Sequence, residues 1–150
     1  MTIRKATIDD AVAIARIGAE VQEMHHEHGP DWFRPPSAQS TVALYEGLLQ
    51  DPAVTAYLDK DDGVTWGFVI FRVGIHKPDN PLAWAQTIVN IDQIGVVRSA
   101  RRRGVGHELI NAARDLANEV SASLIDLTTW EFNREARQFF EAEWRRCVGP

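Results

Sequence analysis

The sequence predicts one α/β domain over residues 1–150 (α+β in some schemes), with a mixed sheet and helices packed on both of its faces. Three observations predict it. A chain of 150 residues has the length of one domain and can bury a real core. Its 45% apolar and 25% charged residues are typical of an ordinary globular protein. Segments with strand-like and helix-like apolar spacing follow one another in the order β-α-α-β-β-β-α-β-α.

The first residues predict a strand and then a helix. Ile3 to Ala6 has the composition of a short strand, and Thr7 and Asp10 after it have the spacing of a capping box. The helix is expected to run to about Met24 and to end before Gly29–Pro30. Its apolar positions are Val12, Ala15, Ile17 and Val21.

A second helix and a run of strands follow the Pro35–Pro36 loop. Ser40 is expected to cap this helix, which runs through Leu49 and stops at Asp51–Pro52. Turn formers at 59–63 and 74–81 separate the expected strands, which are Ala53 to Leu58, Val64 to Val73, and Ala83 to Val97. If the register of the last strand is unbroken, one of its faces carries Ile88, Asn90, Asp92, Ile94 and Val96.

The C-terminal third predicts a helix, a strand and a further helix. From Gly104 the helical spacing is carried by Val105, Leu109, Ala112, Leu116 and Val120. Ser123 to Thr129 is expected to form a strand, and the last helix is expected from Asn133 to about Glu143. The apolar side of that helix carries Ala136, Phe139 and Phe140.

Charge and composition exclude several classes of function. The net charge of −5 argues against general nucleic-acid binding, which needs a broad basic face. No apolar run is long enough to span a membrane, and the N-terminus lacks the apolar region of a secretory signal. Cys147 is the only cysteine, so neither an internal disulfide nor a thiolate metal cluster is expected. We therefore expect a cytoplasmic protein that uses no metal.

The segment from Arg98 to Ile110 carries the strongest functional signal. It follows an apolar run, Ile91 to Val97, and holds four arginines and no acid before Gly106. Where a strand turns into a helix, unpaired backbone N–H groups and the positive end of the helix dipole attract phosphate. Glycines there let the backbone approach a ligand closely. On an acidic protein, this local positive turn suits a small anionic ligand better than a polymer.

Four motifs together resemble those of a known family. Arg101-x-x-Gly104-x-Gly106 matches an Arg/Gln-x-x-Gly-x-Gly/Ala signature that lies between a fourth strand and a third helix. The other motifs, spread over almost the whole chain, are Ile3-Arg4-Lys5-Ala6-Thr7 with Asp9-Asp10, Gly67-Phe68-Val69, and Asn133-x-x-Ala136-x-x-Phe139-Phe140. In this order and spacing they resemble the GNAT family of N-acetyltransferases.

The resemblance implies a fold and a co-substrate. GNAT sheets are mostly antiparallel, and their fourth and fifth strands splay apart to hold the pantetheine of acetyl-CoA. By this resemblance, the residues expected to bind acetyl-CoA are Ile94, Gly95, Val96, Arg101, Arg102, Arg103, Gly104, Val105, Gly106 and Asn133. The short segment after the last helix implies that the closing hairpin of the family is shortened or absent. A homodimer partner is one candidate to cover the sheet edge that this exposes.

The implied reaction is direct transfer of the acetyl group from acetyl-CoA to a primary amine. Asp92 is the candidate base for the ammonium proton, and Asn90 is the candidate that positions a water. The alternative for Asp92 is an aspartate satisfied by a local hydrogen bond at a bulge. Glu131, expected near the cleft, and the overall acidity favour a cationic amine as acceptor.

Phe140 departs from the family pattern, which commonly has a tyrosine there to protonate the leaving thiolate. Phenylalanine donates no proton, so a non-catalytic acyl-CoA-binding or interaction module of the same fold is the alternative function. A nucleotide-binding domain that only mimics the turn is a third candidate. The cluster of His25, His26 and His28 either contacts the acceptor or forms a polar helix end, and its spacing does not suit a metal site.

Overall fold

The computed structural model describes the backbone of residues 2–147 and the side chains of residues 2–144, so the side chain of Cys147 lies outside it. Its five-stranded sheet has the order β1-β2-β3-β4-β5. The strands are β1 (Ile3–Lys5), β2 (Val54–Asp61), β3 (Val64–His76), β4 (Gln86–Val96) and β5 (Leu124–Leu127). The first three pairings are antiparallel and the β4–β5 pairing is parallel, which confirms the mixed, mostly antiparallel sheet.

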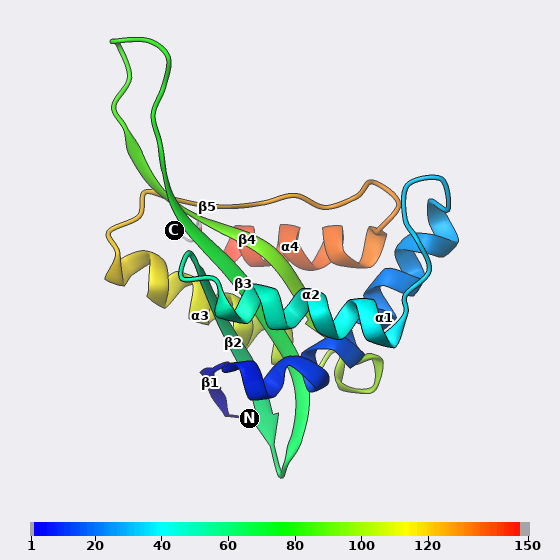
Figure 1. Ribbon diagram of the computed structural model, residues 1–150. Helices are drawn as coiled ribbons and strands as arrows, with labels where there is room; N and C mark the ends of the chain where they lie inside the picture. The colour runs from blue at the N-terminus through cyan, green and yellow to red at the C-terminus, as the bar shows by residue number, and fades with distance from the viewer. Residues whose placement is uncertain (1, 148–150) are drawn as a thin grey trace.

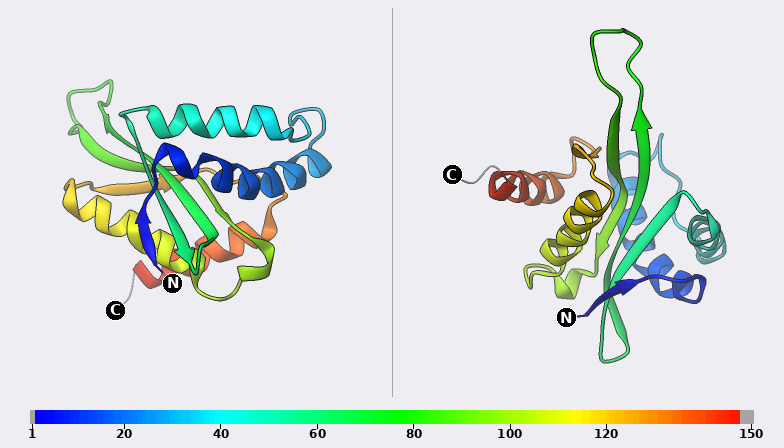
Figure 2. Two further views of the ribbon diagram at one scale, coloured as in Figure 1. Left: turned by 60° about the horizontal axis from the view of Figure 1, so that its bottom comes forward. Right: turned by 90° about the vertical axis from the view of Figure 1, so that its left-hand side faces the viewer.

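Helices cover both faces of the sheet, as predicted (Figure 1, Figure 2). The helices α1 (Ala11–His28) and α2 (Ala38–Gln50) pack on one face, and α3 (Val105–Glu119) and α4 (Arg134–Cys147) pack on the other. Successive residues of β3 point to opposite faces, so Phe68 and Ile70 join the core under α1 and α2, whereas Val69 and Phe71 join the core under α3. None of the described helices combines the length and the apolar character needed to cross a membrane.

The capping box predicted at Thr7 and Asp10 is confirmed. The Thr7 backbone N–H donates to Asp10 Oδ2 at 2.8 Å, and Arg4 donates to both carboxylate oxygens of Asp10, at 2.9 and 2.7 Å. The box opens a short 3-10 turn, η1 (Ile8–Asp10), and α1 then runs to His28, one turn beyond the predicted end. The helix contacts β3 and β4 of the sheet.

The cap predicted at Ser40 is wrong by three residues. Ser37 has an extended backbone and caps α2 instead, accepting a hydrogen bond from the Ser40 backbone N–H at 3.2 Å. Ser40 lies inside the first turn of the helix. Pro36 has a fixed φ and keeps Pro35 out of the helical conformation. Ser37 is the first residue after this restricted pair, and it caps the helix.

The β3–β4 hairpin is longer than the sequence predicts at its β3 end. The two strands pair as far as Ile75 with Thr87 and His76 with Gln86, so Gly74, expected in a loop, lies in a strand. On the β4 side of the same loop, residues 83–85, which were expected in the strand, lie before β4 begins at Gln86. Cross-strand pairing overrides the local glycine signal, and the hairpin projects beyond the helices (Figure 1).

The predicted single face of β4 is wrong, because the strand contains a β-bulge. Ile70 pairs with Gln93 and Phe71 pairs with Ile91, which leaves Asp92 without a partner on β3. A bulge inserts one residue and changes the phase of the strand. Val89 and Ile91 therefore face the core under α3, and beyond the bulge Ile94 and Val96 pack on that same side.

The splay of β4 from β5 is confirmed. The two strands pair from Ile88 with Leu124 to Ile91 with Leu127, where β5 ends. β4 continues to Val96 without a partner on that side. Within residues 2–147 no strand follows β5, so β5 is an edge of the sheet. The residues of β4 beyond Ile91 are therefore open on the β5 side.

Candidate functional site

Two cavities flank the unpaired part of β4. The larger cavity encloses about 820 Å³ and the smaller about 500 Å³. They meet at a shared wall whose residues come from α1, β4 and the start of α4: Val21, Ile94, Asn133, Ala136 and Phe140. Beyond Ile91, where β5 ends, β4 lines both cavities: Asp92 and Gln93 line the smaller, Gly95 and Val96 line the larger, and Ile94 lines both.

The larger cavity contains most of the residues expected to bind acetyl-CoA. Those in its lining are Ile94, Gly95, Val96, Arg101, Arg102, Gly104, Gly106 and Asn133. Arg103 and Val105 do not line it. Arg103 is exposed elsewhere on the turn, and Val105 is buried in the core under α3.

The start of α3 forms one end of this cavity. Gly104, the N-cap, has φ of 84°, in the left-handed region that glycine adopts without strain. The first bond of the helix joins the Glu108 N–H to the Gly104 carbonyl, at 3.0 Å, so the amides before Glu108 have no helical acceptor. Together with the helix dipole, these amides make the end of the cavity electropositive.

Arg101 ties the turn to α4. Its guanidinium donates to Glu135 Oε2 at 3.0 Å and, through Nε, to the Val96 carbonyl at 3.5 Å. Arg98, Arg102 and Arg134 also line the cavity. The cationic side chains thus lie around the helix start, where an anion would be held.

Asn133 caps α4. Its Oδ1 accepts a hydrogen bond from the Ala136 N–H at 3.2 Å, and its own N–H donates to the Trp130 carbonyl at 3.0 Å. The side-chain oxygen of Asn133 is therefore bonded to the helix backbone. Its side-chain nitrogen, Nδ2, is the group left for a ligand at the shared wall.

Phe140 is the aromatic residue at the junction of the cavities. It is buried, lines both cavities, and packs against Phe139 with ring centroids 5.2 Å apart. It brings no hydroxyl to the shared wall. Tyr45 of α2 lines the smaller cavity, and Tyr57 lines neither cavity.

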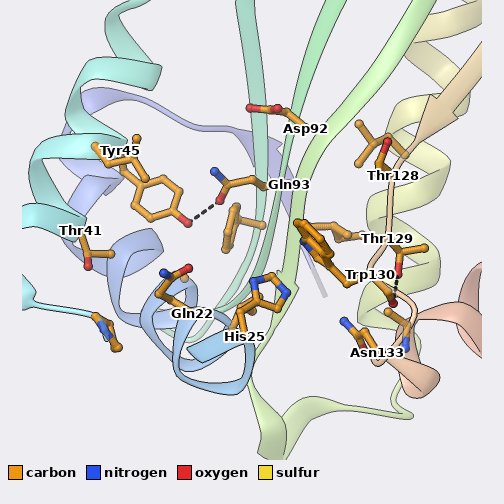
Figure 3. Close-up of a pocket in the computed structure, with 18 of the residues that line it drawn as sticks. Gln22, His25, Thr41, Tyr45, Asp92, Gln93, Thr128, Thr129, Trp130 and Asn133 are labelled. Carbon is orange, nitrogen blue, oxygen red and sulfur yellow. Dashed lines mark hydrogen bonds between the residues drawn. The ribbon is translucent and has the colours of Figure 1, made fainter. Parts of the chain in front are cut away.

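Tyr45 and Gln93 form a hydrogen-bonded pair in the smaller cavity (Figure 3). The Tyr45 hydroxyl donates to Gln93 Oε1 at 2.5 Å. Burial, with a smaller contribution from the charge of Asp92, raises the pKa of Tyr45 to about 12, so its proton stays in place at neutral pH. Gly18 of α1 makes room for the ring, since a Cβ there would lie 2.7 Å from two ring carbons.

Asp92 and Asn90, the two predicted catalytic residues, are separated by the structure. Asp92 lines the smaller cavity, is about one-third exposed, and has Arg72 Nε at 3.9 Å from its Oδ2. Asn90 lines neither cavity, and its amide donates to Asp126 Oδ1 of β5 at 2.7 Å. Asp92 remains a candidate for chemistry, whereas Asn90 holds two strands together.

Aromatic rings close one side of both cavities. His25 contacts Phe33 at 4.8 Å between centroids, and His28 stacks on Phe132 at 5.1 Å. Trp130 meets Phe33 edge-on. Burial, followed by the nearby His28, lowers the pKa of His25, so this ring is neutral at pH 7.

The three histidines were expected either to contact the acceptor or to form a polar helix end, and they differ in this respect. His25 lines the smaller cavity and His28 the larger, whereas His26 bonds the Phe33 carbonyl through Nδ1 at 2.7 Å. Among the described side chains, no group of three or more His, Cys, Asp or Glu could hold a metal ion.

Sequence reasoning missed Gln93, Tyr45 and the Thr128–Thr129 pair as site residues. Gln93 enters the cavity through the bulge, which no local pattern in β4 indicates. Thr128 and Thr129 line the smaller cavity just after β5 ends. Their position directly after the splayed strand was the one available signal.

Comparisons with known proteins agree with this geometry. The model of the acetyltransferase (GNAT) family matches residues 21–144. The uncharacterized N-acetyltransferase YhfO of Bacillus subtilis (strain 168) is 26% identical over 141 residues, covering 94% of this chain and 87% of that protein.

Solved structures extend the likeness to the fold. A mutant of the BH1408 protein from Bacillus halodurans is 22% identical, with a TM-score of 0.88 over 100% of this chain and 96% of that one. A ribosomal-protein-alanine N-acetyltransferase from Brucella melitensis biovar Abortus 2308 is 26% identical, with a TM-score of 0.69 over 95% and 90% of the two chains. An aminoglycoside N-acetyltransferase in complex with CoA is 18% identical, with a TM-score of 0.73 over 94% and 84%. The family model covers most of the chain, and the sheet and its two cavities agree with it. The protein belongs to the acetyltransferase (GNAT) family.

Proposed function

We propose that the protein transfers the acetyl group of acetyl-CoA to a primary amine by direct attack of the amine on the thioester. The observation that carries this proposal is the meeting of two cavities at the unpaired end of β4. A two-substrate transfer without a covalent enzyme intermediate needs both substrates bound at once, with their reacting atoms at a common wall. The shared wall of Ile94, Asn133 and Phe140 provides that meeting point.

The larger cavity suits the cofactor. Its electropositive end at the start of α3 fits a pyrophosphate, and the open backbone of Ile94 to Val96 fits an extended pantetheine that pairs as an added strand. Asn133 then contacts the cofactor through its free amide nitrogen. The thioester lies beside the shared wall, where backbone groups near Val96 polarise its carbonyl.

The smaller cavity suits the amine. The acceptor ammonium first gives one proton to Asp92, directly or through water, and the neutral amine then attacks the thioester carbon. A C–N bond forms, the C–S bond breaks, and the nitrogen loses its second proton to water as the amide forms. Tyr45, whose pKa is about 12 and whose proton is bonded to Gln93, is a poor acid for the departing thiolate. Phe140 has no proton to donate. The departing thiolate therefore takes its proton from solvent.

The experiment measures acetyl-CoA binding by calorimetry and thiol release over a panel of amines. Binding together with release on at least one amine supports the proposal. Arg102→Glu should weaken binding about tenfold or more, because Arg102 lines the larger cavity. Arg16→Glu makes the same charge change on an exposed position of α1 that lines neither cavity, and should bind as the parent protein does.

A second candidate function is a non-catalytic acyl-CoA-binding module, and Phe140 is the observation that favours it. It predicts binding of acetyl-CoA that Arg102→Glu weakens, with no thiol release on any amine of the panel. Absence of acetyl-CoA binding would contradict both candidates.

A further inference from the structure

The bulge in β4 gives the smaller cavity two adjacent and chemically opposite side chains. On a regular strand, consecutive residues point to opposite faces. Because Asp92 is the inserted residue, both Asp92 and Gln93 line the smaller cavity, and both leave β4 toward α2 (Figure 3). Their Cα atoms are about 3.8 Å apart, as for any two successive residues.

Asp92 presents a hydrogen-bond acceptor with a negative charge. No hydrogen bond to its carboxylate occurs among the described residues, and Arg72 Nε, at 3.9 Å, is beyond hydrogen-bond distance. Arg72 is also shared with Asp51 Oδ2, at 3.4 Å. A ligand ammonium group would give the Asp92 carboxylate the direct hydrogen bond that its ion pair with Arg72 does not provide.

Gln93 presents a hydrogen-bond donor. Its Oε1 already accepts from Tyr45, which keeps its proton and is held in place by the close approach to Gly18. The amide is thereby oriented with Nε2 as the group left over, and Nε2 has no partner among the described residues. Nε2 can only donate, so its complement is a carbonyl or carboxylate oxygen.

The charge of the cavity argues against a polycation. Asp92 and Arg34 are the only side chains in its described lining that are charged at neutral pH, because His25 stays neutral. Glu131, expected to add acidity, does not line it. A second or third ammonium group would find no carboxylate, whereas Arg34 adds a positive charge for an anionic group.

We infer that the acceptor is an α-amino carbonyl compound, with its amine on the Asp92 carboxylate and its carbonyl oxygen on Gln93 Nε2. An amine and a carbonyl oxygen on neighbouring carbons enter a site together, and the bulge turns two successive side chains, an acceptor and a donor, into the same cavity. A cavity of about 500 Å³ holds such a group together with a side chain of its own. Free amino acids and the N-termini of peptides share this chemistry. The inference rests on the proposed acetyl transfer.

The experiment compares acceptors in a thiol-release assay. The panel contains α-amino acids, the corresponding amino acid amides, the amines that lack the carbonyl group, and a polyamine. We expect the amino acids and their amides to have kcat/KM at least tenfold above the matched amines and the polyamine. The comparison of acid with amide distinguishes a free amino acid, which Arg34 favours, from a peptide N-terminus.

Gln93→Glu tests the donor. Glutamate keeps the oxygen that accepts from Tyr45 and replaces Nε2 with an anionic oxygen. We expect KM for the α-amino carbonyl acceptors to rise about tenfold or more relative to KM for the amine that lacks the carbonyl. Gln39→Glu, on an exposed position of α2 that lines neither cavity, carries the same charge change and should leave both unchanged.

Two results separate the inference from the function it rests on. Thiol release that is fastest with the polyamine or the simple amines, or a Gln93→Glu variant that treats all acceptors alike, overturns the inference and leaves acetyl transfer standing. Absence of thiol release with every acceptor, including the simple amines, overturns the proposed function instead. A thermal scan of Gln93→Glu shows that the variant is folded.

Discussion

Gly18 and Gly47 are both interior helix glycines, and replacing each with alanine should have opposite effects on stability. In a helix interior, alanine is favoured over glycine by about 0.5–1 kcal/mol. Gly47 of α2 has no heavy atom within 4 Å of the position that a Cβ would take. Gly47→Ala should therefore raise the free energy of unfolding by about 0.5–1 kcal/mol.

Gly18→Ala meets the Tyr45 ring. The new Cβ would lie 2.7 Å from Cε2 and Cζ, against an ordinary contact of about 3.5–4.0 Å, so the ring must move by several tenths of an ångström or more. The ring is buried, lies edge-on to Phe68, and is bonded to Gln93, so it cannot move freely. Overpacking costs about 1–3 kcal/mol, and loss of the Tyr45–Gln93 bond costs about 1 kcal/mol more.

Subtracting the gain in helix propensity leaves a net loss of about 1–3.5 kcal/mol for Gly18→Ala. Urea unfolding of the two variants and the parent protein measures the difference, and thermal unfolding should show Tm falling by roughly 2–4 °C per kcal/mol. If Gly18→Ala stabilises the protein as Gly47→Ala does, the close packing of Tyr45 on α1 is refuted, and with it the fixed orientation of Gln93.

Three further predictions concern ionisation. The hydrogen bonds from Arg4 lower the pKa of Asp10 in the folded state, so its contribution to stability is present above the unfolded pKa of about 4 and is lost as pH falls through the folded value. In urea unfolding, Asp10→Asn should cost more stability at pH 7 than at pH 3, and an equal cost at both would contradict the pairing. Burial raises the pKa of Asp59, so its ionised form opposes folding, and stability is lost as pH rises from about 4 through the folded value. Asp59→Asn should therefore increase the free energy of unfolding at pH 7 but not at pH 3, and a decrease at pH 7 would refute this reasoning. Asp92→Ala should lower kcat and remove the acid limb of the pH profile of kcat/KM in the thiol-release assay, since the proton acceptor is gone; an unchanged profile would exclude Asp92 from that role.

The order of the elements could be predicted from the sequence because its signals are local. Thr7 and Asp10 are three residues apart, and Gly104 stands directly before the helix that it caps, so one window contains each signal. The resemblance to the GNAT family then supplied the splay of two strands, which no local window contains.

The phase of β4 and the make-up of the smaller cavity could not be predicted in this way. The bulge at Asp92 arises from the pairing of β4 with β3. The alternation of apolar and polar residues along β4 does not indicate whether the strand contains a bulge. Tyr45 reaches Gln93 across 48 positions of the chain. Ser37 and Ser40 are equally good caps by composition, and the choice depends on how Pro36 directs the chain.

The bonds at the two ends of β5 determine where the cleft opens. Asn90 binds Asp126 near the open end, and at the other end the Ser123 N–H donates to the Thr87 carbonyl at 3.0 Å. A slip of β5 by one residue along β4 would move the point at which the two strands separate by about 3.3 Å. It would also turn the residues beyond Leu127 to the opposite face. Asn90 lines neither cavity, yet its bond to Asp126 stabilises the register in which β4 is unpaired beyond Ile91.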